Sequence, residues 1–151
     1  TFFLQIYYEY MLGIDKAEYI NGLRLIDSFV LVDEADDLMK HEFDFLYSIL
    51  KQGREYGIGA ILASQYMSHF RAKNTNYIEN LQTWNVMCDK SISARDLDAI
   101  GIKENKENIS KRIQTLNIHQ LLHKTHSKRI FLENKPFYKI ISQKENEQDT
   151  I

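Results

Sequence analysis

The sequence predicts an α/β fold with a mostly parallel sheet and flanking helices, because short apolar runs alternate with segments of helical periodicity. Three runs of strand length, residues 29–32, 59–64 and 84–88, are almost entirely apolar and follow polar or glycine-containing flanks. Such runs are typical of strands that are buried on both faces, as in a parallel sheet. We therefore predict that strands at 28–33, 59–64 and 84–88 lie in one sheet.

The connection between the first two strands is predicted to be a helix at residues 35–56. Its apolar residues recur in steps of four, three and four, which gives a helix with one apolar stripe, and they are Met39, Phe43, Leu46 and Leu50. Gly57 follows as a candidate C-terminal cap, since glycine readily takes the left-handed conformation that ends many helices.

Other helices are predicted from apolar spacing and from capping signals. Ser93 with Asp96 three residues later is the pattern of a capping box, which marks a helix N-terminus. Residues 13–24 are expected to form a loop or a short helix. The helices predicted in this way are residues 2–12, 75–82, 94–100 and 106–123.

The C-terminal part of the chain predicts a β-hairpin. Residues 128–133 and 136–142 have strand-like composition and flank Asn134 and Lys135, as expected for two strands and a turn. The remaining residues, 143–151, predict a polar, disordered tail. We therefore expect one folded domain at residues 1–142.

Charge, cysteine content and the length of apolar runs limit the classes of function that are open to this chain. The 151 residues carry a net charge of −2 and are 44% hydrophobic and 26% charged, so no global basic field indicates nucleic acid, and a basic surface must be local. Cys88 is the single cysteine, which excludes an internal disulfide and favours a reducing, cytoplasmic setting. No apolar run approaches the ~20 residues of a membrane span. The chain lacks an initiator Met, and we expect it to be part of a longer protein.

An acidic pair follows the first predicted strand. Asp33 and Glu34 come directly after four apolar residues, and in open α/β sheets ligands sit beyond the carboxyl ends of the strands. An aspartate there can hold Mg²⁺ through water, and a glutamate can orient or deprotonate an attacking water. The alternative interpretation is an acidic helix start, since Asp36 and Asp37 also favour a helix N-terminus.

The stretch "LVDEAD" resembles the Walker B motif of P-loop NTPases, and its surroundings are similar to the HerA/FtsK branch. A helix ending in "GREYGIG" and a strand ending in "ILASQ" follow it. Within that branch, "ILKQGREYGIGAILASQYMSHF" looks most like the HerA-type ATPases of DNA phosphorothioation-dependent restriction systems. The resemblance is strong over residues 25–70 and loose up to 142, and it implies a RecA-like fold.

The resemblance also implies roles for four residues. Asp33 is the Mg²⁺-associated aspartate and Glu34 the catalytic base. Gln65 is a polar sensor between the γ-phosphate and the attacking water. Arg54 is a candidate arginine finger, acting on the nucleotide of a neighbouring subunit. Gln65 can instead cap the next helix, and Arg54 can instead be a cation in the last turn of its own helix.

Half of the implied nucleotide site is missing from these residues. No Gly-x-x-x-x-Gly-Lys-Ser/Thr sequence occurs in the chain, so the loop that cradles phosphates is expected upstream. The RecA-like fold is then represented by a fragment that lacks the Walker A half, and the 151 residues alone are expected to bind ATP poorly and to be inactive.

A histidine-rich segment offers a second kind of site. His119, His123 and His126 have the spacing of one helix face, which can bind zinc. Gln120 stands where a zinc protease has its catalytic Glu, and no cysteine accompanies the cluster. A basic surface for DNA or a neighbouring subunit, continuing into residues 128–130, and a plain solvated helix face are the other interpretations.

The resemblance implies an ATP- and Mg²⁺-dependent motor of the translocase or helicase kind. The complete protein would act on double-stranded DNA as a homo-oligomeric ring, a hexamer, in DNA restriction or processing, alongside other restriction-system subunits. Two alternatives stay open. The "DEAD" letters at residues 33–36 are shared with DEAD-box RNA helicases, although those carry Ser-Ala-Thr where this chain has "ILASQ". A non-catalytic interaction module that retains the fold is the third interpretation.

Overall fold

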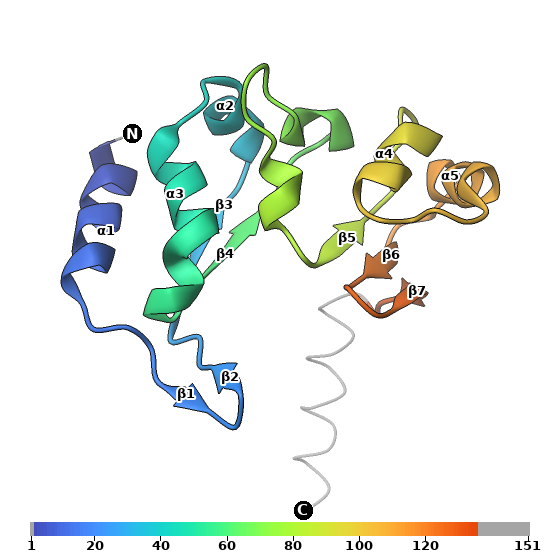
Figure 1. Cartoon of the computed structure of the whole chain (residues 1–151). Helices are drawn as coiled ribbons and strands as arrows, with labels where there is room; N and C mark the ends of the chain where they lie inside the picture. The colour runs from blue at the N-terminus through green and yellow to red at the C-terminus, as the bar shows by residue number, and fades with distance from the viewer. Residues whose placement is uncertain (1, 136–151) are drawn as a thin grey trace, which may run out of the picture. The chain divides into compact units, whose positions relative to one another are not determined.

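The computed structural model describes residues 2–135, which belong to two compact units that divide between Leu81 and Gln82. Figure 1 shows the course of the chain. The first unit contains helices and two small sheets, and the second contains helices and one sheet. No helix among the described residues has the length and apolar character needed to cross a membrane.

The first unit is built on a parallel pair of strands. β3 (Ser28–Val32) and β4 (Ile58–Leu62) are paired in parallel, with Val32 opposite Leu62. The pair confirms the two strands predicted at this part of the sequence and their parallel direction. The segment between them crosses over in helices, as a parallel connection requires. These are α2 (Ala35–Lys40), α3 (Asp44–Gln52) and the 3₁₀ helix η1 (Gly53–Tyr56).

The prediction of one continuous helix at residues 35–56 is wrong. The helix breaks after Lys40, where Glu42 takes the left-handed conformation (φ 51°) and Phe43 is extended. The Glu42 carboxylate accepts hydrogen bonds from the backbone N–H and the side-chain amide of Asn74. This contact with a distant loop fixes the break, because local helix propensity is a weak preference that tertiary contacts override. Gly57 (φ 70°) does cap η1, as predicted.

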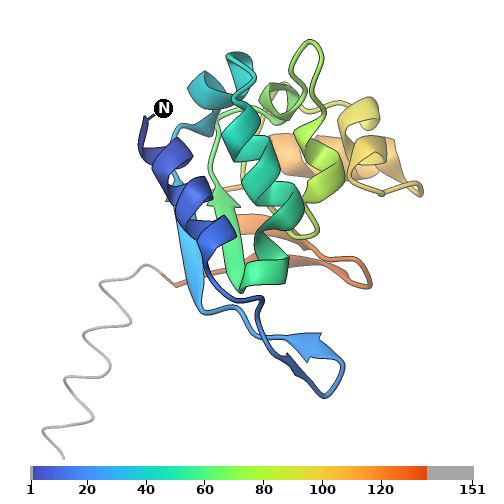
Figure 2. The ribbon, with the colours of Figure 1, turned by 60° about the vertical axis from the view of Figure 1, so that its left-hand side comes forward.

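Helix α1 (Phe2–Gly13) confirms the helix predicted at the start of the chain. It lies beside α3 in both ribbon views (Figures 1 and 2) and in direct contact with it. Leu4 and Met11 are buried, and both belong to the apolar core of this unit. Most other apolar side chains of α1 are exposed, among them Phe2, Phe3, Ile6, Tyr10 and Leu12.

The expectation that the first two strands are buried on both faces is also wrong. Val30 is buried, whereas Phe29 and Leu31, which point to the other side, are 60% and 70% exposed. The Phe29 ring covers Gly59 on the neighbouring strand, where an added Cβ atom would lie 2.4 Å from Phe29 Cε1. The apolar run therefore reflects one core-facing side and one outer side of a two-stranded pair.

Short elements complete the first unit. β1 (Tyr19–Ile20) and β2 (Leu23–Arg24) form a small hairpin within the segment expected to be a loop or short helix. Its turn, Asn21–Gly22, has positive φ at both residues, which is the signature of the Asn-Gly type I′ turn. Two 3₁₀ helices follow β4, namely η2 (Met67–Phe70) and η3 (Tyr77–Asn80). The second lies within the helix predicted at 75–82.

The second unit is an antiparallel sheet with two helices. β5 (Trp84–Val86) pairs with β6 (Gln120–Lys124), and β6 pairs with β7 (Arg129–Glu133). The placement of the third predicted strand in the parallel sheet is therefore wrong, because that strand pairs with β6. Helices α4 (Ala94–Ala99) and α5 (Lys106–Gln114) lie between β5 and β6 in the chain.

Capping is predicted correctly in this unit, but one helix end is not. Ser93 and Asp96 form the predicted capping box, in which each side chain bonds the backbone N–H of the other. The helix predicted at 106–123 ends at Gln114, because the residues after it pair as β6. The predicted strand at 128–133 is confirmed as β7, with β6 as its partner. The second half of the predicted hairpin, 136–142, and the predicted tail lie outside the described residues.

Candidate functional site

The acidic pair lies where the parallel strands end. Beyond β3, the backbone N–H of Ala63 donates to Val32 O (2.9 Å), and the N–H of Ala35 donates to Ala63 O (2.8 Å). Ala63 thus holds the backbone on both sides of the Asp33–Glu34 turn. The turn is fixed to the neighbouring strand at the carboxyl edge of the pair, which is the edge where α/β sheets bind ligands.

The turn itself has an uncommon backbone. Glu34 has φ 51° and ψ 46°, a left-handed conformation that residues other than Gly seldom take and that is enriched mainly in Asn, Asp and His. Its N–H donates to Asp33 Oδ1 (3.0 Å), so one oxygen of that carboxylate is engaged within the turn. Both residues are exposed. Held in this way, the two carboxylates are accessible to a ligand and carry local backbone strain of the kind found at functional sites.

The end of β4 carries the second predicted element of the site. Gln65 follows β4 by three residues and is exposed. Since β3 and β4 are adjacent and parallel, Gln65 and Asp33 leave neighbouring strands at the same edge, as predicted. The approach of their side chains to one another stays a prediction.

A network that the sequence did not predict connects the two loops. The half-buried His69, in η2, has its Nδ1 2.9 Å from Ser64 Oγ and 3.7 Å from Asp36 Oδ2. The ring of Tyr66 meets the His69 ring edge-on, with centroids 5.2 Å apart. The loop that carries Gln65 is thereby joined to the first turn of α2, directly after Glu34.

This network is not a Ser-His-Asp catalytic triad. In a triad the serine and the aspartate bond to opposite nitrogens of the imidazole ring, whereas Ser64 and Asp36 both approach Nδ1 of His69. Nδ1 can form one well-aligned hydrogen bond at a time. The shorter distance indicates that this bond is to Ser64. The arrangement suits positioning of the two loops and does not provide an activated nucleophile.

Arg54 lies away from the acidic edge. It is exposed in η1, which directly precedes β4, and therefore belongs to the amino end of the strands. The five residues of β4 span about 17 Å at ~3.3 Å per residue. This separation places Arg54 out of reach of the Asp33–Glu34 turn in its own subunit.

The histidine cluster is not a metal site. His119 has a left-handed backbone before β6, and His123 lies within β6, so the helical spacing that motivated a zinc site is wrong. His123 Nδ1 is instead 2.8 Å from Asn85 Oδ1 on β5. No group of three or more His, Cys, Asp or Glu side chains that could hold a metal ion is found within residues 2–135.

Magnesium does not require such a group. Mg²⁺ keeps several waters and is commonly bound through one or two carboxylates together with substrate phosphates. Asp33 and Glu34, exposed on a turn fixed to the strand edge, fit that donor set. No protein-family model matches the chain, and no curated protein matches it at a significant level.

Proposed function

We propose that this chain is the Walker B part of a RecA-like ATPase of the HerA/FtsK type. The observation that supports the proposal is the carboxyl edge of β3 and β4, where Asp33, Glu34 and Gln65 leave adjacent parallel strands. In the complete protein, ATP and Mg²⁺ bind at this edge, with the phosphate-cradling loop supplied by sequence outside these 151 residues. The protein acts in the cytoplasm as a DNA translocase or helicase-like motor on double-stranded DNA, in DNA restriction or processing.

Each residue has a specific role in the proposal. Asp33 would hold Mg²⁺ through water, since one of its carboxylate oxygens is not engaged by Glu34 N–H. The metal, when bound, would supply charge neutralisation at the phosphate oxygens. Glu34 orients and deprotonates the attacking water, and Gln65 hydrogen-bonds that water or the phosphate. The His69 contacts join the loop that carries Gln65 to the first turn of α2, directly after Glu34, which supports this role for Gln65.

Arg54 serves a neighbouring subunit in this proposal. Its place at the opposite end of β4 suits an arginine that reaches across an interface of a homo-oligomeric ring, with a hexamer as the expected size. A guanidinium supplied in this way is worth roughly 10³ to 10⁵ in rate. Arg54→Ala subunits should be inactive alone and should regain turnover when mixed with subunits that lack the phosphate-loop lysine. Mixed rings that exchange subunits but stay inactive would remove this role.

The test of the catalytic assignment is Glu34→Gln in the complete protein. It keeps the size of the side chain and removes the base, so ATP binding should persist while turnover falls at least ~10²-fold. Asp37→Asn is the matched control, because it makes the same charge change three residues away at another exposed position. The isolated 151 residues should hydrolyse no ATP.

Turnover and ATP-binding measurements on the complete protein also distinguish the proposal from the DEAD-box-like and the non-catalytic alternatives. Unchanged turnover in Glu34→Gln removes Glu34 from the mechanism. Turnover that depends on RNA and not on DNA favours a DEAD-box-like helicase core. Absence of ATP binding by the complete wild-type protein favours a non-catalytic interaction module.

A further inference from the structure

Formal charge is divided unevenly between the two units. Residues 1–81 contain seven Lys or Arg and twelve Asp or Glu, a net charge of −5. The second unit, residues 82–151, contains twelve Lys or Arg and nine Asp or Glu, a net charge of +3. The small net charge of the whole chain therefore conceals a basic second unit, and a basic unit attracts polyanions.

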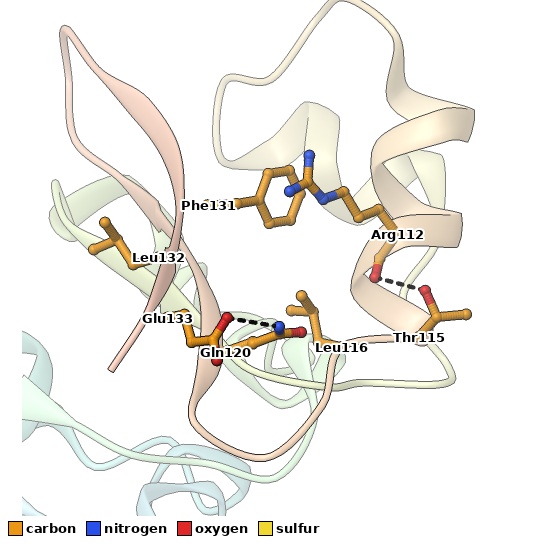
Figure 3. A pocket seen from close by; sticks show the side chains of 7 residues that line it. All are labelled: Arg112, Thr115, Leu116, Gln120, Phe131, Leu132 and Glu133. Atoms are coloured by element: carbon orange, nitrogen blue, oxygen red, sulfur yellow. Dashed lines mark hydrogen bonds between the residues drawn. The ribbon is translucent and has the colours of Figure 1, made fainter. Parts of the chain in front are cut away.

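One arginine of the second unit is held in place by an aromatic ring. The guanidinium of Arg112, in the last turn of α5, stacks over the ring of Phe131 on β7, with its carbon 3.7 Å from the ring centroid. Figure 3 shows the pair at a hollow of about 320 Å³ between α5 and β7. Stacking uses the face of the guanidinium and leaves its N–H donors at the edge. Within residues 2–135 these donors have no hydrogen-bond or ion-pair partner.

Two further cations lie on the same side of the sheet. Arg129 is two residues from Phe131 on β7, so both side chains point to the side of α5. Lys124 is the cross-strand partner of Arg129. Like charges directly opposite one another destabilise an antiparallel pair, and an anion bound between them removes that cost.

Lys128 follows in the exposed turn next to Arg129. The acidic group in this hollow, Glu133, lies at the far end of β7 and accepts a hydrogen bond from Gln120 (3.2 Å), as Figure 3 shows. The cations therefore gather toward the β6–β7 turn, and the carboxylate is engaged away from it.

We propose that Arg112, Lys124, Lys128 and Arg129 form a contact surface for the phosphodiester backbone of nucleic acid. Guanidinium groups match phosphate oxygens in a two-bond geometry, and Phe131 holds Arg112 ready for it. Several cations grouped toward the β6–β7 turn suit a chain of phosphates better than one isolated anion. The proposal names the residues of the second unit that contact nucleic acid. This contact does not require ATP hydrolysis.

The test measures binding of a short fluorescein-labelled DNA duplex to the complete protein by anisotropy, without nucleotide and over a range of salt. Arg112→Ala and Arg129→Ala should each weaken binding by about tenfold and reduce the salt slope by about one phosphate contact. Lys90→Ala removes the same charge from the loop after β5 and should leave affinity within about twofold. Thermal unfolding of each variant separates lost binding from lost folding.

Phe131→Leu tests the positioning of Arg112. It retains an apolar side chain and every cation, so affinity should fall severalfold while the salt slope stays unchanged. Equal effects of Lys90→Ala and Arg112→Ala would show a nonspecific net-charge effect and overturn the surface. Equal competition by polyglutamate at matched charge would also overturn it, since a general anion surface would then explain binding. Because the binding assay contains no nucleotide, a negative result in it does not bear on the role of Glu34. A negative result with Glu34→Gln likewise does not bear on this surface.

Discussion

Replacing Glu34 by Gly is expected to stabilise the fold and, under the proposed function, to abolish ATP turnover. The left-handed conformation of Glu34 (φ 51°) costs an L-residue roughly 1–2 kcal/mol, a cost that Gly does not have. Gly in turn loses more backbone entropy on folding, about 0.5–1 kcal/mol. The Glu34 side chain has no hydrogen bond to other residues of the described part. The net result is a gain of about 0.5–1 kcal/mol in the free energy of unfolding.

Glu42 provides the matched control for this prediction. It has the same φ of 51°, but its carboxylate accepts two hydrogen bonds from Asn74, one of them 2.9 Å long from the side-chain amide. Glu42→Gly removes the same backbone strain and loses both bonds. It should therefore be less stable than Glu34→Gly.

Urea unfolding followed by circular dichroism measures both variants, with stability compared at unchanged slope. ATP turnover is measured on the same preparations of the complete protein. A Glu34→Gly protein less stable than wild type would show that the acidic turn carries no strain, and the reasoning from φ would fail. A Glu42→Gly protein as stable as Glu34→Gly would show that the Asn74 bonds contribute nothing.

Two further predictions concern polar groups in the first unit. Tyr77 is fully buried, its pKa is raised by burial, and its Oη has no partner among the described residues. Tyr77→Phe keeps the edge-on ring contact with Tyr47 and should raise the free energy of unfolding by about 1 kcal/mol in urea titrations; a decrease would mean that the hydroxyl is paired. Backbone and side-chain hydrogen bonds from Asn74 hold the pKa of Glu42 below its ordinary 4.5. The stabilisation is present above that value and is lost as pH falls through the folded-state pKa. Asn74→Ala removes the side-chain bond and keeps the backbone bond, so it should flatten the acid side of the stability curve in part. An unchanged curve would show that the side-chain bond contributes nothing to the lowered pKa.

The sequence predicts those parts of the fold that depend on local pattern. The apolar runs locate β3 and β4, and Ser93 with Asp96 locates the start of α4, because strand burial and capping depend on nearby residues. The break at Glu42 depends on Asn74, 32 residues away, and no local signal contains that contact. β6 has a short apolar core, Leu121–Leu122, that fits a helix as well as a strand. Its pairing with β5 and β7 determines that this segment is a strand and not a helix.

The candidate site was predictable to a similar extent. Asp33, Glu34 and Gln65 each follow an apolar strand, so their common edge follows from a parallel pair. The His69 network does not follow, because it joins side chains from a strand end, a 3₁₀ helix and α2. An acidic residue in the first turn of a helix, with a Ser and a His around the next strand end, is the signal that could have indicated it, and it is weak.

Under the two proposals, the charge division favours separate locations for phosphate hydrolysis and for contact with a nucleic acid backbone. Asp33, Glu34, Asp36 and Asp37 lie within five residues in the unit of net charge −5. A phosphodiester chain brought close to them is repelled, whereas a single nucleotide arrives with Mg²⁺, which compensates its charge. The second unit has a net charge of +3 and no run of four acidic residues within five, and among residues 2–135 the guanidinium donors of Arg112 have no hydrogen-bond or ion-pair partner. Charge reversal at Arg129 should therefore weaken DNA binding and leave DNA-independent ATP turnover of the complete protein unchanged. A parallel loss of both activities would show that hydrolysis and DNA contact share one surface.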